Sequence, residues 1–202
     1  ILHRQGTADL FIDIISSRRE AITMCLNSGW GTGKTFFLSR LCEQYRRHKV
    51  NGIGGRAIYF NAWEDDNLSD PLVAIVGQLW KNLKGGTCDE CAKTIIQCVP
   101  KIINRTAFNA MLGLLKSVPV VGKAIEEFTN DLAPEDLETA SERVFGNYCQ
   151  LTEDKADLRN RLGELGTKIM AETDRPLLFV IDELDRCRPT FAIETLERVK
   201  HL

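Results

Sequence analysis

The sequence predicts an α/β fold in which helices cover a parallel sheet, and three observations lead to this prediction. A glycine-rich turn at residues 28–35 follows an apolar run and opens a helical pattern. A second apolar run, at 56–62, is again followed by a helical pattern. A third run, at 177–183, is apolar until it ends in two acids, which is typical of a strand buried on both faces.

The elements of the first half of the chain can be assigned in order. A helix is expected at residues 7–18, where apolar side chains recur at helical spacing. The next elements are expected to be a strand, a helix, a turn, a strand and a helix, in this order: residues 20–27, 34–49, 52–55, 56–62 and 71–84. The last of these helices follows Asp70 and has Pro71 at a first-turn position, where the missing N–H costs nothing.

The second half contains more residues than a simple fold needs. A strand–helix–strand crossover takes about 30 residues, so roughly 70–90 residues before the acidic strand are surplus. We expect an all-helical insertion over residues 85–151, and a core formed by residues 1–84 and 152–202. Spaced apolar positions predict helices at residues 92–103, 107–115, 122–132, 134–149 and 147–172.

Residues 28–35, here called the phosphate loop, have the composition that phosphate binding requires. Glycines let successive backbone N–H groups converge on an anion, and the helix that follows directs its positive end to the same point. Lys34 is expected to contact the β- and γ-phosphates, and the Thr35 hydroxyl is expected to bind Mg²⁺. The predicted nucleotide-binding residues are Gly29, Trp30, Gly31, Thr32, Gly33, Lys34, Thr35 and Phe36.

The phosphate loop departs from the strict pattern at one position. That pattern begins with Gly, whereas this chain has Ser28, which serves if the local dihedral angles are ordinary. The alternative interpretation is an ordinary glycine-rich turn that precedes a helix and by chance ends in Lys-Thr. It requires the loop, its flanking elements and the acidic strand to coincide by chance.

The acidic strand carries a second set of functional groups. Asp182 is expected at its carboxyl end, where open α/β sheets bind ligands, and there it would hold Mg²⁺ through water. Glu183 would act as the general base that deprotonates a water aimed at the γ-phosphate. The alternative is that Asp182 has a structural role and caps the helix that follows the strand. The two segments together predict a nucleoside triphosphatase, with Lys34 and Glu183 catalytic and with Thr35 and Asp182 as metal ligands.

Three segments, taken in order, resemble the KAP family of P-loop NTPases. They are Gly29-Trp30-Gly31-Thr32-Gly33-Lys34-Thr35, Tyr59-Phe60-Asn61-Ala62-Trp63-Glu64 and Ile181-Asp182-Glu183-Leu184-Asp185-Arg186-Cys187. The resemblance is good over residues 6–83 and 174–202 and poor between them. It implies a three-layer P-loop core with a parallel sheet, and it gives Glu183 the role of base in the additional-strand class of ATPases. Asp185 and Arg186 match an Asp-Arg pair of the family, to which we assign no role from the sequence.

The resemblance also implies ATP as the nucleotide and, for many bacterial members, a place in defence against phage. It implies one more core strand, which lies outside this chain, so the core is expected to be incomplete at the C-terminus. The start without Met and the end within a helical pattern agree with a piece of a longer protein. Hydrolysis would then drive a conformational switch in that protein, in a homo-oligomer or in partner proteins.

Two other classes of function remain open at this point. The first is a nucleotide-dependent signalling or scaffold module that holds ATP and scarcely hydrolyses it. The second is a phosphotransferase or a GTPase switch, although no Asn-Lys-x-Asp segment for guanine recognition occurs in the sequence. Adjacent Asp182 and Glu183 favour attack by water.

Charge and hydropathy give no support for nucleic acid or a membrane span as an interaction of this chain. A formal net charge of −2 gives no electrostatic footprint for nucleic acid. Residues 102–121 invite a membrane interpretation, but Arg105, Lys116 and Pro119 leave too short an uncharged stretch, because a span needs about 20 residues. We expect a helical lid or bundle there and leave contact with a membrane surface or a partner helix open.

Cysteine usage suggests a reducing compartment, so a cytoplasmic location is expected. Most of the seven cysteines lie in predicted helices or strands, as buried hydrophobic residues do. Cys88, Cys91 and Cys98 are close in sequence, but no second Cys pair or nearby His completes a four-ligand zinc site.

Four further residues lie near the predicted site. Glu64 follows the second strand and could contact a water or the metal, whereas Trp63 beside it is more often a packing residue. Arg186 and Arg188 could reach the nucleotide of a neighbouring subunit as arginine fingers do. Local ion pairs with Asp182, Asp185 or Glu194 are the favoured alternative.

Overall fold

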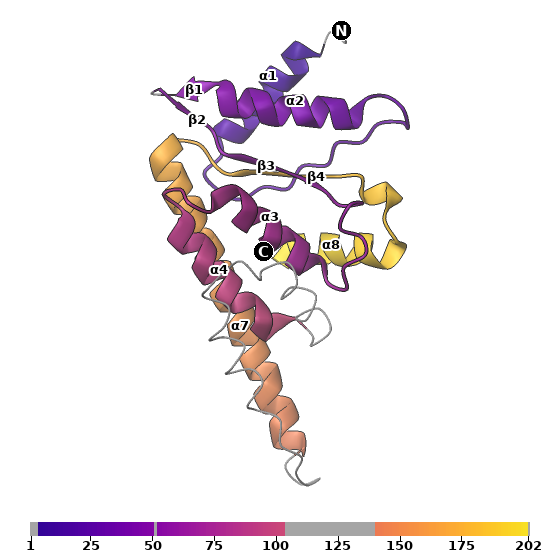
Figure 1. Cartoon of the computed structure of the whole chain (residues 1–202), viewed down its shortest axis with the longest axis vertical. Coiled ribbons are helices and arrows are strands. Elements are labelled where there is room, and N and C mark those ends of the chain that lie inside the picture. The colour runs from indigo at the N-terminus through magenta and orange to yellow at the C-terminus, as the bar shows by residue number, and fades with distance from the viewer. Residues whose placement is uncertain (1–3, 51, 104–139, 202) are drawn as a thin grey trace. The chain divides into compact units, whose positions relative to one another are not determined.

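A computed structural model of the chain describes residues 4–50, 52–103 and 140–201 (Figure 1). The elements, in chain order, are α1 (Gln5–Ser16), α2 (Lys34–Arg47), β1 (Lys49–Val50), β2 (Ile53–Gly54), β3 (Ala57–Asn61), α3 (Pro71–Leu83), α4 (Asp89–Ile102), α7 (Ala140–Thr173), β4 (Leu178–Asp182), the 3₁₀ turn η2 (Leu184–Arg186) and α8 (Pro189–His201). The helices predicted at 7–18, 34–49, 71–84 and 92–103 and the strands predicted at 56–62 and 177–183 are confirmed within a few residues.

The chain divides into two compact units. Unit 1 comprises Ile1–Glu64 and Leu165–Cys187, and unit 2 comprises Asp65–Glu164 and Arg188–Leu202. The boundary between them falls inside α7, the longest helix of the described residues. The predicted division into a core over 1–84 and 152–202 and an insertion over 85–151 stays a prediction.

Unit 1 is built around a parallel pair of strands that are distant in sequence. β3 pairs with β4 in a register that places Ala57 opposite Leu178 and Asn61 opposite Asp182. Figure 1 shows α1 and α2 on one face of this pair. The hydrophobic core between these elements comprises Ala8, Ile12, Ile15, Phe37, Leu41, Cys42, Tyr45, Ala57 and Val180.

Helical periodicity explains how α2 packs on this core. Phe37, Leu41 and Tyr45 are spaced by four residues, so they share one face of the helix and are all buried. The Tyr45 hydroxyl donates a hydrogen bond to the Pro176 carbonyl oxygen, 2.7 Å away, next to the start of β4. The helix that follows the phosphate loop is therefore held directly against the acidic strand.

The strand predicted at residues 20–27 is wrong for the described structure. Residues 21–29 have no regular secondary structure, and Ile22 and Met24 are exposed. A strand forms only when a neighbour supplies ladder hydrogen bonds, and the pairings among the described residues join only β1 with β2 and β3 with β4. Leu26 nevertheless packs against the core of unit 1.

Unit 2 is helical in its described residues. α3 is buried on most sides through Leu72, Val73, Ala74, Ile75, Val76, Leu79 and Leu83. Its first turn is capped by Asp70, whose carboxylate accepts a hydrogen bond from the Leu72 N–H at 2.9 Å. The Asp70 side chain also pairs with Arg198 of α8, so the same carboxylate caps one helix and links it to another.

The two helices predicted at 134–149 and 147–172 are instead one continuous helix over the part of this stretch that is described, α7. Residues 140–173 contain no proline, and the three glycines at 146, 163 and 166 lower helix propensity without ending the helix. The helices predicted at 107–115 and 122–132, and most of the 102–121 stretch tested for membrane insertion, lie outside the described residues.

The chain has an α/β fold, with helices and a small parallel sheet. The three-layer arrangement and the all-helical insertion stay predictions. Among the helices of the described ranges, none combines the length and apolar character that a membrane span requires.

Candidate functional site

The phosphate loop has the backbone geometry that its glycines permit. Gly31 has a φ of 73° and Gly33 a φ of 84°, and Gly33 directly precedes the first residue of α2. Such left-handed conformations strain any residue with a Cβ, so these two positions favour glycine. Ser28 is not among the described residues with positive φ, so its backbone does not require glycine at this position.

Side chains of the loop brace the turn from within. The hydroxyls of Ser28 and Thr32 lie 2.8 Å apart, and Thr32 also donates to the Gly29 carbonyl oxygen at 2.8 Å. Lys34 Nζ donates to the carbonyl oxygens of Ser28 and Gly29, at 2.8 and 3.3 Å. Two of the three ammonium protons therefore hold the lysine across the loop, and the third is available to an anion.

Asp182, the last residue of β4, is 6% exposed and is held by two donors. The Glu183 N–H donates to its Oδ1 at 2.8 Å, and the Tyr59 hydroxyl donates to its Oδ2 at 2.7 Å. Burial raises the pKa of Tyr59, and the hydrogen bond to Asp182 raises this pKa further. Tyr59 thus remains a hydrogen-bond donor at neutral pH, and each oxygen of Asp182 keeps a lone pair for another partner.

Glu183 follows the strand in a strained backbone conformation. Its φ of 60° is left-handed, which is uncommon for a residue with a long side chain and is often found at functional sites. This turn starts η2 and directs the Glu183 side chain, which is 12% exposed, to Arg186. Arg186 Nη2 lies 3.1 Å from Glu183 Oε1, and the Arg186 guanidinium carbon lies 5.7 Å from the centre of the Trp63 ring.

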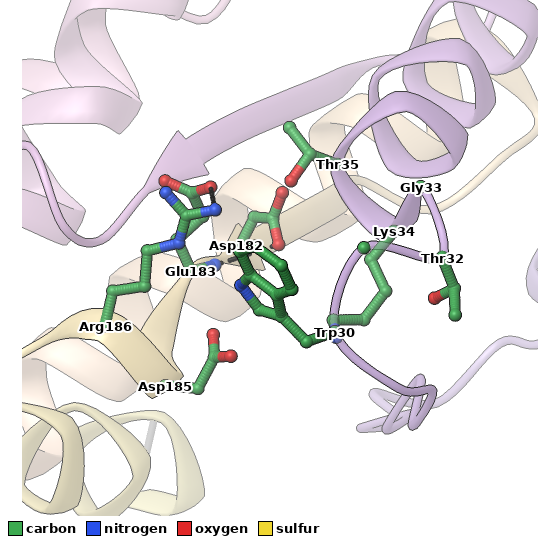
Figure 2. Close-up of a pocket in the computed structure, with 10 residues that line it drawn as sticks. Trp30, Thr32, Gly33, Lys34, Thr35, Asp182, Glu183, Asp185 and Arg186 are labelled. Carbon is green, nitrogen blue, oxygen red and sulfur yellow. Dashed lines mark hydrogen bonds and ion pairs between the residues drawn. The ribbon is translucent and has the colours of Figure 1, made fainter.

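These groups meet at a cavity of about 230 Å³ within unit 1. Figure 2 shows the phosphate-loop residues on one side of it and Glu183, Asp185 and Arg186 on the other. The lining residues are Trp30, Gly31, Thr32, Gly33, Lys34, Thr35, Asp182, Glu183, Asp185 and Arg186. The phosphate loop and Asp182 come together because α2, which follows the loop, packs on β4, the strand that ends in Asp182 and pairs with β3.

Eight of the predicted site residues line the cavity, and two do not. Gly29 contributes its carbonyl oxygen to the internal bracing of the loop. Phe36 is 54% exposed, and the Arg40 guanidinium lies 5.5 Å from its ring centre. The roles predicted for all ten residues stay predictions, since the geometry concerns only where they lie.

The structure adds three residues to the predicted site. Asp185 and Arg186 line the cavity, and the sequence had marked them through the family's Asp-Arg pair and, for Arg186, as a possible arginine finger. Tyr59 was missed, because its signal is the register of the strands: it lies two residues before Asn61 on β3, and therefore on the face that Asn61 shares with Asp182.

The other residues that the sequence suggested for the site have contacts of their own. Glu64 Oε1 accepts a hydrogen bond from Asn61 Nδ2 at 2.9 Å and does not line the cavity. Arg188 pairs with Asp66 at 3.1 Å, within unit 2. Both arginines of the 186–188 segment thus have local partners, as favoured from the sequence, but the partners are Glu183 and Asp66 rather than the carboxylates named there.

Among the cysteines whose side chains the structure describes, none lines the cavity. The Cys98 thiol donates to Asp157 at 3.2 Å, and burial, followed by this contact, raises the pKa of Cys98 to about 11. No group of three or more His, Cys, Asp or Glu suited to a metal occurs among residues 4–50, 52–103 and 140–201.

The donors at the cavity suit Mg²⁺ chemically. The Thr35 hydroxyl and the Asp182 carboxylate are hard oxygen donors, and both residues line the cavity. Mg²⁺ commonly takes one or two oxygens from a protein and the remainder from water and phosphate groups. The residues present therefore fit a nucleotide-bound magnesium ion.

Comparison with known families agrees with this geometry. The sequence matches the family model described as KAP family P-loop domain over residues 4–202. No curated protein and no solved structure matches the chain. The match includes the phosphate loop, β3 and the acidic end of β4, so it covers every residue that lines the cavity.

Proposed function

The chain belongs to the KAP family of P-loop domains, and on this premise we propose that it binds ATP with Mg²⁺ and hydrolyses it. The observation that carries the proposal is the meeting of the phosphate loop with Asp182 and Glu183 at one cavity. Loop, lysine and paired acids are the groups that phosphoryl transfer to water requires.

The size and lining of the cavity support binding of the triphosphate part of the nucleotide. Its volume of about 230 Å³ lies below the roughly 300–1,000 Å³ of pockets that enclose a whole small molecule. Glycines, a lysine and hydroxyls form one wall, as suits an anion. Backbone N–H groups at the start of α2 add the positive end of a helix.

Each side chain has a stated task in the proposed reaction. Lys34 and the loop N–H groups bind the β- and γ-phosphates and stabilise the charge that develops on their oxygens. Thr35 and Asp182 would hold Mg²⁺, which supplies charge neutralisation between the β- and γ-phosphates when bound. Glu183 accepts a proton from a water as the water oxygen bonds to the γ-phosphorus. The bond between that phosphorus and the β–γ bridging oxygen breaks, and ADP leaves with its electron pair.

Hydrolysis in this proposal serves as a timed conformational switch for a larger protein, an oligomer or a partner. A cytoplasmic location and a role in bacterial defence against phage belong to the same proposal and rest on the family resemblance. The main competing function is a module that binds ATP and scarcely hydrolyses it. This alternative would require the ion pair between Glu183 and Arg186 to keep the predicted base away from its water.

Two substitutions test the proposal. Lys34→Ala should weaken equilibrium binding of Mg-ATP by about ten- to a hundredfold, because it removes charge-assisted hydrogen bonds. Glu183→Gln should preserve binding and lower phosphate release by about 10²- to 10⁴-fold, since it removes only the general base. Both quantities are measured by nucleotide titration and by phosphate release at saturating ATP.

Matched controls are Lys81→Ala on α3 and Glu197→Gln on α8, which are exposed and do not line the cavity. Both should bind and hydrolyse ATP as the wild type does. A wild-type chain without affinity for ATP would overturn the proposal. Binding without turnover in the wild type would support the competing module, and a preference for GTP would overturn the choice of nucleotide.

A further inference from the structure

Two residues of the family-like segments, Trp63 and Arg186, have no task in the proposed reaction, and the structure places Arg186 against Glu183 and Trp63 against Arg186. Arg186 Nη2 lies 3.1 Å from Glu183 Oε1, and the Arg186 guanidinium carbon lies 5.7 Å from the Trp63 ring centre. All three residues belong to unit 1. Figure 2 shows the Arg186 side chain alongside that of Glu183.

The backbone explains why Arg186 returns to Glu183. The left-handed Glu183 starts η2, so that the Arg186 N–H donates to the Glu183 carbonyl oxygen at 3.1 Å. A residue three positions later in such a turn lies over the first, because a 3₁₀ helix has three residues per turn. Main chain and side chain of Arg186 therefore both contact the same residue.

The pairing of β3 with β4 places Trp63 beside this turn. β3 ends at Asn61 opposite Asp182, so the residues that follow each strand emerge at the same edge of the sheet. The Trp63 N–H donates to Asn61 Oδ1 at 3.2 Å, which fixes the start of its loop. Trp63 is 53% exposed, so it is not the buried packing residue that sequence reasoning favoured. Its ring is available as a surface for a guanidinium group.

This arrangement restricts the Glu183 carboxylate while leaving it one free oxygen. The ion pair is given by its contact with Oε1, and no hydrogen bond of Oε2 occurs among the described residues. A glutamate side chain alone samples several rotamers, and a base is effective only when it is held within hydrogen-bond reach of its water. Holding Oε1 reduces the rotamers, and Oε2 remains to accept the proton.

We propose that Arg186 is a positioning residue that holds Glu183 for proton transfer, and that Trp63 holds Arg186. The inference rests on the proposed function, in which Glu183 is the general base. It assigns Arg186 no contact with the nucleotide, and it assigns Trp63 no contact with Glu183. The expected order of importance is therefore Glu183, then Arg186, then Trp63.

The test compares Arg186→Ala in two backgrounds by single-turnover hydrolysis of Mg-ATP, together with equilibrium binding. In the wild-type background the substitution should lower the rate by about ten- to a hundredfold, since small displacements of a catalytic group cost rates of this size. The dissociation constant of ATP should not change. In the Glu183→Gln background the same substitution should lower the rate no further, because its target is already absent.

Conservative variants separate positioning from folding. Arg186→Lys should restore part of the rate, because it keeps the charge and loses the planar fork. Trp63→Phe should retain most of the rate and Trp63→Ala should lose part of it. Adding Trp63→Ala to Arg186→Ala should have no further effect. If Arg186→Ala does not fold, Arg186→Lys and Trp63→Ala make the same comparison in both backgrounds.

The chain offers a matched control on α2. Arg40 Nη1 pairs with Glu43 Oε2 at 2.7 Å, three residues later, and its guanidinium carbon lies 5.5 Å from the Phe36 ring centre. It thus combines an ion pair and an aromatic contact of the same kind, and Arg40 does not line the cavity. Arg40→Ala should leave both the rate and ATP binding unchanged.

Several results would overturn the inference while the proposed function stands. An equal loss of rate in both backgrounds would mean that Arg186 acts on the phosphate directly. A higher rate in Arg186→Ala would mean that the ion pair restrains the base, and weaker ATP binding would make Arg186 a binding residue. A wild-type chain that binds ATP and shows no turnover would instead overturn the proposed hydrolysis, and this inference with it.

Discussion

Tyr59 donates its hydroxyl to Asp182, a residue 123 positions further along the chain. Asp182 is a ligand of Mg²⁺ in the proposed function, and partners that hold a ligating carboxylate often contribute about ten- to a hundredfold to metal affinity. Tyr59→Phe should therefore raise the Mg²⁺ concentration needed for half-maximal ATP binding by about tenfold. The measurement is a nucleotide titration at a series of Mg²⁺ concentrations.

Tyr45→Phe is the control for this prediction. Tyr45 lies in the same core, and its hydroxyl donates to the Pro176 carbonyl oxygen at 2.7 Å. Both substitutions should lower the free energy of unfolding by about 1–2 kcal/mol, since each leaves an acceptor without its donor. Only Tyr59→Phe should change the dependence on Mg²⁺. The same Mg²⁺ dependence in wild type and Tyr59→Phe would show that the hydroxyl serves stability alone.

Predictions for single residues were confirmed where the conformation depends only on residues a few positions away in the sequence. Gly31 and Gly33 have the positive φ values for which glycine is suited, and that requirement can be read from the loop itself. Phe36 was expected at the nucleotide and lies on the exposed side of α2, whereas Phe37 is buried. Spacing with Leu41 and Tyr45 identifies Phe37 as the residue that packs on the core, and the contact of Phe36 with the nucleotide stays a prediction.

At the scale of elements, α3 depends on a single carboxylate at its start. Asp70 is 5% exposed, caps the Leu72 N–H and pairs with Arg198. Asp70→Ala should lower the free energy of unfolding by about 2 kcal/mol, because it removes a cap and leaves the arginine without its partner. Urea unfolding followed by circular dichroism measures the change.

Asp70→Asn separates the two contributions, because asparagine caps a helix as well as aspartate does but lacks its charge. It should cost less than half as much as Asp70→Ala. Equal losses in the two variants would assign the stabilisation to the ion pair with Arg198 instead of the cap. No loss in either variant would contradict both contributions.

Elements were predicted well where their own sequence determines them. The helices from α1 to α4 follow from apolar spacing, and the Pro71 start and the Asp70 cap of α3 are local signals. The strand expected at 20–27 did not form, because apolar residues alone do not supply a pairing partner. β3 and β4 formed because each has the other in register.

At the scale of the whole molecule, every residue that lines the cavity belongs to unit 1. A ligand that binds only the folded state stabilises it by about 2.7 kcal/mol at a concentration of a hundred times the dissociation constant. Saturating Mg-ATP should therefore raise the unfolding midpoint of unit 1 and slow hydrogen exchange in β3 and β4. If unit 2 unfolds in a separate transition, that transition should not move.

Lys34→Ala provides the control for this effect, because it should abolish most of the binding while leaving the core of unit 1 in place. Its unfolding midpoint should not respond to Mg-ATP at concentrations that shift the wild type. Equal shifts in the wild type and in Lys34→Ala would mean that ATP stabilises the protein from another site.

The sequence by itself determined the chemical groups of the site, their order, the family and the left-handed turns of the phosphate loop. These depend on residue type and on interactions within a few positions. Only the tertiary structure decided that Tyr59 contacts Asp182 and that Trp63 lies beside Arg186, since both contacts follow from the register of β3 against β4. Register between strands so far apart in the chain is set by packing of the whole core, which local periodicity does not encode.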